Sequence, residues 1–108
     1  MGSGSMDKIA GLREILAQDP KNTFARYGMA MELARRGEVD AALAEFDTLL
    51  TNNSDYTAAY FMAAQALEKA GRRSEAVERL KAGVASAKRT GNQHALSEMQ
   101  GMLDELDR

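Results

Sequence analysis

Two consecutive stretches of the chain follow one pattern: residues 23–56, TFARYGMAMELARRGEVDAALAEFDTLLTNNSDY, and residues 57–90, TAAYFMAAQALEKAGRRSEAVERLKAGVASAKRT. Laying the second stretch on the first places identical residues on one another, namely Thr23 on Thr57, Ala25 on Ala59, Ala30 on Ala64, Leu33 on Leu67, Gly37 on Gly71 and Ala42 on Ala76. Large side chains also recur at equivalent positions of the two stretches, as Phe46 and Leu80 do. Self-similarity at one fixed period indicates a repeat architecture, in which each repeat buries its apolar face against the next.

Good helix formers dominate the sequence of 108 residues, and no run alternates Val, Ile or Thr with polar residues in the manner of a strand. The single proline and the Gly and Asn clusters divide the chain into six helical segments, near 7–18, 22–36, 39–52, 56–70, 73–89 and 92–107. Such short connections force neighbouring helices to run antiparallel. We therefore predict an all-α fold of about six antiparallel helices.

Alternation of small and large side chains predicts how these helices pack. Two helices approach closely only where a small side chain on one faces a large one on the other. Ala30 and Ala64 supply the small sites on the first helix of each hairpin, with Leu33 and Leu67 one turn later. On the second helices the small sites are Ala42 and Ala76, followed by the large side chains of Phe46 and Leu80. Gly37 and Gly71 are expected to end the first helices in the left-handed conformation that only Gly adopts cheaply.

With these residues in view, the chain resembles the tetratricopeptide-repeat family. Its pattern is met in the first repeat by Met29-Ala30, Leu33, Ala42 and Phe46, although Arg26 and Ser54 replace the family's Trp and closing Pro. The resemblance implies an α-α superhelix. It divides a single domain of residues 6–108 into an N-terminal half-repeat helix (7–18), repeat 1 (23–56), repeat 2 (57–90) and a C-terminal capping helix (91–108).

Composition bounds the class of protein further. Residues 1–5, MGSGS, read as a tag remnant left by cloning, ahead of a native Met6. The absence of cysteine suits a reducing compartment, and no apolar run reaches the roughly 20 residues that span a bilayer. We expect a cytoplasmic protein with no membrane segment, and with no metal or cofactor. The one histidine, His94, has no cysteine or carboxylate at metal-ligand spacing, so we interpret it as a packing or capping residue and expect no enzyme activity.

The resemblance also implies where a partner binds. First helices of the family line a concave groove, and mapping its positions onto this chain gives Phe24, Tyr27, Met31, Arg35, Phe61, Gln65, Glu68, Lys69 and Met99. Large apolar groups beside polar ones suit a peptide with hydrophobic anchors, so we predict a protein- or peptide-binding adaptor or scaffold.

Family members that bind the C-terminal carboxylate of chaperones use Lys and Asn in the groove. Tyr27, Met31 and Met62 occupy those places here, so no chaperone tail of that kind is expected.

Two alternatives stay open. An acidic middle around residues 38–55 precedes a basic stretch at residues 72–89, within a net charge of −2. We interpret them as solvated helix faces, but opposite charge on successive segments also allows self-association; a monomer is favoured because both end helices have polar outer faces. The basic stretch could instead contact an acidic partner or RNA. RNA binding is disfavoured because the cations lie mostly on a second helix, away from the aromatic residues.

Overall fold

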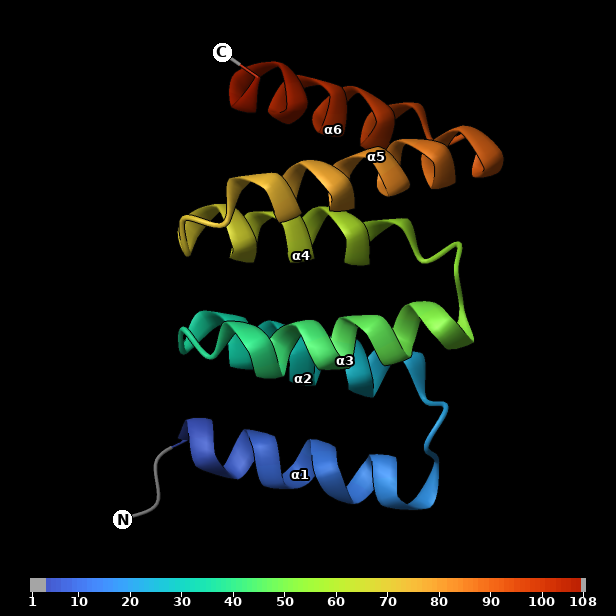
Figure 1. Cartoon of the computed structure of the whole chain (residues 1–108). Coiled ribbons are helices and arrows are strands. Elements are labelled where there is room, and N and C mark those ends of the chain that lie inside the picture. Colours follow the sequence, from blue (N-terminus) through green and yellow to red (C-terminus); the bar gives the residue numbers. More distant parts are fainter. Residues whose placement is uncertain (1–3, 108) are drawn as a thin grey trace. The chain divides into compact units, whose positions relative to one another are not determined.

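The computed structural model describes residues 4–107, with side chains from Lys8 onward. It contains six helices and, within that range, no strand (Figure 1). Their bounds are α1 Gly4–Gln18, α2 Thr23–Arg35, α3 Val39–Asn52, α4 Thr57–Lys69, α5 Arg73–Thr90 and α6 Gln93–Leu106. The predicted all-α architecture is confirmed.

The beginning of α1 differs from the prediction. Gly4 and Ser5, interpreted as part of a tag remnant, belong to the helix, whereas residues 1–3 lie outside the described part of the chain. A first turn can include such residues because its N–H groups need no partner within the helix.

The helices form two compact units, which divide after Asn52. Unit 1 contains α1, α2 and α3, and unit 2 contains α4, α5 and α6. The boundary falls in the connection between the two sequence repeats, so each unit holds one complete helical hairpin and one further helix that packs on it.

In unit 1, the α2–α3 hairpin closes over small side chains. Ala30 and Ala42 are fully buried, as is Phe46, one turn after Ala42. On the other side of α2, α1 packs with Ile9 buried, and Leu12 covers the bare backbone of Gly28.

Glu32 of α2 is a charged residue buried within unit 1, with 4% of its side chain exposed. Its carboxylate is surrounded by cations: Lys8 Nζ at 3.7 Å, Arg36 Nε at 3.4 Å, and Arg35, whose guanidinium donates to both carboxylate oxygens. The hydrogen bonds to Glu32 raise the pKa of Arg35. Paired in this way, the carboxylate can remain charged while it ties α1 to α2.

Unit 2 repeats the same hairpin core. Ala64, Leu67, Ala76 and Leu80 are all fully buried. Gly71, like Gly37 in unit 1, has a positive φ, 78° and 82° respectively, and follows the end of the first helix.

Equivalent positions of the two repeats tether the first helix to the loop before it. In unit 1, Arg26 donates to the carbonyl oxygen of Pro20 at 2.8 Å and pairs with Glu45 at 2.6 Å. In unit 2, the hydroxyl of Tyr60 donates to the carbonyl oxygen of Ser54, also at 2.8 Å. The repeat places Tyr60 on Arg26 and Ser54 on Pro20, so different side chains perform one structural task.

The regular period ends at α5. This helix starts in step with the repeat, at Arg73 against Val39, but it has 18 residues where α3 has 14. Residues 87–90 continue the helix because Ala, Lys and Arg favour it, whereas the matching Asn53-Ser54 favours a turn. As a result, α6 begins at Gln93, two residues later than the position that the repeat pairs with Thr57 at the start of α4.

Gly83 of α5 provides the notch into which α6 packs. A Cβ at this position would overlap the sulfur of Met99 and would lie 2.8 Å from the Cβ of Tyr60. Because Gly83 has no side chain, Met99 of α6 is fully buried between α5 and α4.

We predict that Ala42→Leu and Ala76→Leu each lower the free energy of unfolding by about 1–3 kcal/mol, because added methyl groups overpack a closed helix crossing. Urea denaturation followed by circular dichroism measures both losses. An unchanged midpoint for either variant would contradict the packing described for that hairpin.

We also predict opposite effects for the same substitution at two glycines of unit 2. Gly83→Ala should destabilise unit 2 by about 1–3 kcal/mol, because its Cβ overlaps Met99 and Tyr60. Gly101→Ala should instead stabilise α6 by about 0.5–1 kcal/mol, since nothing lies within 4 Å of its added Cβ and Ala is the better helix former. Thermal unfolding of both variants checks the sign of each change. A stabilising Gly83→Ala would mean that α6 does not pack at this notch.

Candidate functional site

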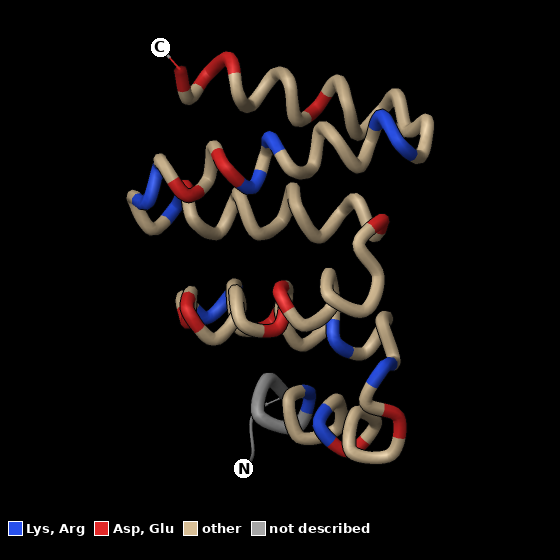
Figure 2. Tube along the Cα trace, turned by 45° about the vertical axis from the view of Figure 1, so that its right-hand side comes forward, with Lys and Arg blue, Asp and Glu red and all other residues tan. Residues whose placement is uncertain are grey.

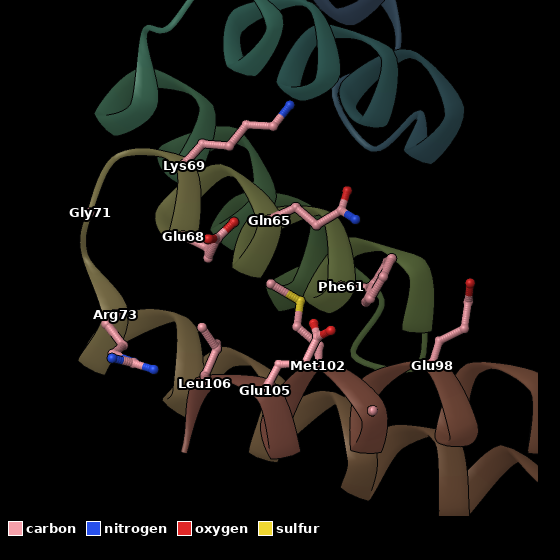
Figure 3. A pocket seen from close by; sticks show the side chains of 11 residues that line it. Phe61, Gln65, Glu68, Lys69, Gly71, Arg73, Glu98, Met102, Glu105 and Leu106 are labelled. Atoms are coloured by element: carbon pink, nitrogen blue, oxygen red, sulfur yellow. The ribbon is translucent and has the colours of Figure 1, made fainter. Parts of the chain in front are cut away.

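A solvent-open groove of about 1020 Å³ lies within unit 2, between α4 and α6 (Figure 3). We call it the α4–α6 groove. One wall is formed by Phe61, Gln65, Glu68 and Lys69 of α4, and the opposite wall by residues of α6. Gly71 and Arg73, at the α4–α5 turn, close one end.

Helical spacing puts the α4 residues on one side. Residues 61, 65 and 68 recur every three or four positions, so their side chains line a single stripe. The α4–α5 hairpin fixes this stripe, because Ala64 and Leu67 face its core on another side of α4. A hydrogen bond of 2.8 Å between the buried hydroxyls of Thr57 and Ser86 also holds the start of α4 against α5.

The floor of the groove is apolar. Phe61 of the α4 wall and Met102 and Leu106 of the α6 wall together form this floor. The end of the Met102 side chain reaches toward α4 (Figure 3). All three side chains are half-buried, so each still offers apolar surface to a ligand. Gly101 lies between Glu98 and Glu105 on the α6 wall and leaves open space beside the helix backbone.

Charged side chains border this floor. The acids are Glu68, Glu98 and Glu105, and the bases are Lys69 and Arg73. Among the described residues, only Glu98 of these five has a titratable partner within 4 Å, since its carboxylate lies 3.5 Å from His94 Nε2. The groove therefore combines an apolar floor with charges that are available to a partner.

The four predicted groove residues of unit 1 follow one side of α2, at residues 24, 27, 31 and 35. Phe24 is 82% exposed, which is unusual for a side chain of its size. Tyr27 is half-buried and packs edge-on against Phe46, with ring centroids 6.3 Å apart, whereas Arg35 is engaged with Glu32. Met31 is half-buried beside them. This side of α2 thus has one exposed aromatic anchor and one aromatic ring that supports the core.

The structure corrects the prediction for Met99. The repeat pairs Met99 with Gln65 and so places it in the groove, but the structure buries it completely against Gly83. The two-residue offset of α6 explains the difference, since it gives the place of Gln65 to Gly101 and the place of Lys69 to Glu105.

The sequence-based prediction missed the rest of the α6 wall for the same reason. The residues concerned are Glu98, Gly101, Met102, Glu105 and Leu106. It also missed Arg73 at the α4–α5 turn, which the offset of α6 does not affect. The signal was present in the predicted segments 73–89 and 92–107, because a fifth helix longer than the third means that the 34-residue period no longer applies to the sixth.

Features that would support other classes of function are few. Three cations of the basic stretch are paired with acids: Arg72 with Glu75, Lys81 with Glu78, and Arg89 with Asp55. His94 is 85% exposed and does not cap α6, because the side chain of Asn92 accepts from the Ala95 N–H instead. Among the described residues, no group of three potential metal ligands comes together, and no described helix is long and apolar enough to cross a membrane.

Repeated antiparallel helix hairpins, with a groove beside a first helix, define a helical-repeat protein. The chain belongs to the tetratricopeptide-repeat family, whose sequence profile matches residues 33–99. It is 27% identical over 100 residues to a TPR repeat-containing protein of Pseudomonas aeruginosa, a match that covers 93% of this chain and 95% of that protein.

Solved structures show the same fold. A solution structure of a Bordetella parapertussis protein is similar with a TM-score of 0.81 and 27% identity, over 100% of this chain and 90% of that one. A tetratricopeptide-repeat domain protein of Salinibacter ruber has a TM-score of 0.73 and 29% identity, over 81% of this chain and 88% of that one. The fold is typical of protein-interaction modules, and the family is generally non-catalytic.

We predict contrasting effects for two phenylalanines of unit 1. Phe24→Ala should change the free energy of unfolding by no more than about 0.5 kcal/mol, because the side chain is exposed. Phe46→Ala should cost about 3–5 kcal/mol, because it empties a fully buried site. Chemical denaturation of both variants tests the contrast, and comparable losses would show that Phe24 is part of the core.

Proposed function

We propose that the protein is a non-catalytic adaptor that binds a peptide segment of another protein in the α4–α6 groove. One observation carries this proposal: half-buried Phe61, Met102 and Leu106 form an apolar floor inside a groove of about 1020 Å³ with charged edges. This volume lies just above the range of about 300–1,000 Å³ that is usual for ligand sites, and it can take several side chains of a peptide.

The way the walls are held supports the proposal. Each wall is anchored by fully buried residues that point away from the groove, Leu67 on α4 and Met99 on α6. A groove between such walls exists before the ligand arrives, so binding does not have to order it. The apolar floor supplies affinity, and the charged edges supply orientation and specificity.

The exposed side of α2 offers a second, smaller surface. Phe24 presents nearly its whole ring to solvent, and Met31 lies two turns further along the same helix side. We include this surface as a further contact for a protein partner. Tyr27, in contrast, supports Phe46, so its removal would disturb the core as well as the surface.

Selection from a random-peptide phage library tests the groove with an unbiased set of ligands. Peptides that bind the chain should bind Phe61→Ala at least tenfold more weakly, because the variant removes the aromatic part of the floor. Fluorescence anisotropy with the selected peptides measures the loss, and far-ultraviolet circular dichroism verifies that helicity is retained.

Leu103→Ala is the matched control. It shortens a half-buried side chain of the same unit that does not line the groove, so peptide affinity should stay within about twofold. Equal affinities for the unaltered chain and Phe61→Ala, or no selected binder at all, would reject the α4–α6 groove as the binding site.

A further inference from the structure

The Asp, Glu, Lys and Arg residues of α6 all have the same sign of charge. This helix contains no Lys or Arg, and its charged residues Glu98, Asp104 and Glu105 are all acidic (Figure 2). Helix α5 beside it mixes both signs. Asp104 and Glu105 lie in the last turn of α6. Because the negative end of the helix macrodipole favours cations there, these two acids lower the stability of the helix.

Two of these acids face the groove. Glu98 and Glu105 both line it and are separated by seven residues, or about 10 Å along the helix axis. Gly101 lies between them and opens the wall, so a ligand backbone can approach α6 closely there. The apolar side chain of Met102 lies next to this opening.

The two cations of the groove lie elsewhere. Lys69 is in the last turn of α4 and Arg73 is the first residue of α5, so both flank the α4–α5 turn at one end of the groove (Figure 3). The α6 wall of the groove is therefore acidic throughout, whereas both cations, with Glu68 beside them, lie at the end closed by the α4–α5 turn.

From this arrangement we infer that the partner segment presents an apolar side chain flanked by two basic residues. This inference rests on the proposed function of the α4–α6 groove. The apolar side chain contacts Phe61 and Met102, and the basic residues pair with Glu98 and Glu105. Three residues of an extended polyproline-II chain advance about 9 Å and return to the same side, which matches the spacing of the two acids.

The selected phage pool tests this chemistry directly. Among binders that depend on Phe61, Lys and Arg should be enriched on both sides of an apolar residue. The double variant Glu98→Lys with Glu105→Lys should bind these peptides about tenfold more weakly at low salt, because two attractions become repulsions. A fresh selection on that variant should enrich Asp and Glu instead.

Asp104→Lys with Asp107→Lys is the matched control, because it makes the same change of net charge at the end of α6 on residues that do not line the groove. It should keep the preference for Lys and Arg. Binders that depend on Phe61 but lack Lys and Arg, or an unchanged preference after reversal of Glu98 and Glu105, would overturn the inference while the proposed function stands. Absence of any binder that depends on Phe61 would reject both.

Discussion

Close approach of helices at a few small side chains is the constraint on which this structure depends. Two helix backbones can approach closely only where one of them has almost no side chain, and an Ala or Gly occupies such places in this chain. Ala42 and Ala76 serve the two hairpins, and Gly83 serves the contact of α5 with α6. This close approach also buries large side chains such as Phe46 and Leu80, which adds hydrophobic stabilisation.

The same constraint leads to the site. Because Gly83 admits Met99, α6 docks on the α4–α5 hairpin through one fully buried residue and leaves the rest of its apolar stripe half-exposed. Met102 and Leu106 are part of that stripe and become the floor of the groove opposite Phe61. The packing surface and the groove surface are therefore two sides of the same helix, and a residue on one side sets the position of the other.

Much of the fold could be predicted from the sequence. Identical residues one repeat apart, such as Ala30 and Ala64, give the helices and the hairpin arrangement, because a packing rule that recurs leaves a recurring pattern. The prediction for Met99 is wrong because it extends that period past α5, where one extra helical turn ends it. The burial of Glu32 could not be predicted either, since it depends on cations from two helices that meet only in the folded unit. The predicted end of the fifth helix at residue 89 agrees with α5 to within one residue. The error came from extending the repeat period across this longer helix, because an offset of two residues rotates every side chain of α6 by about 200°.

The contact of Met99 with Gly83 most directly tests how α6 packs on α5. A methyl-labelled sample should show nuclear Overhauser cross-peaks from the Met99 methyl group to the α protons of Gly83 and to Tyr60, because the Met99 methyl carbon lies 3.3 Å from the position of a Cβ on Gly83. We expect strong cross-peaks and a methyl shift displaced from its random-coil value, because Met99 is fully buried. A Met99 methyl at its random-coil shift, without cross-peaks to α5, would contradict both the packing and the groove that depends on it.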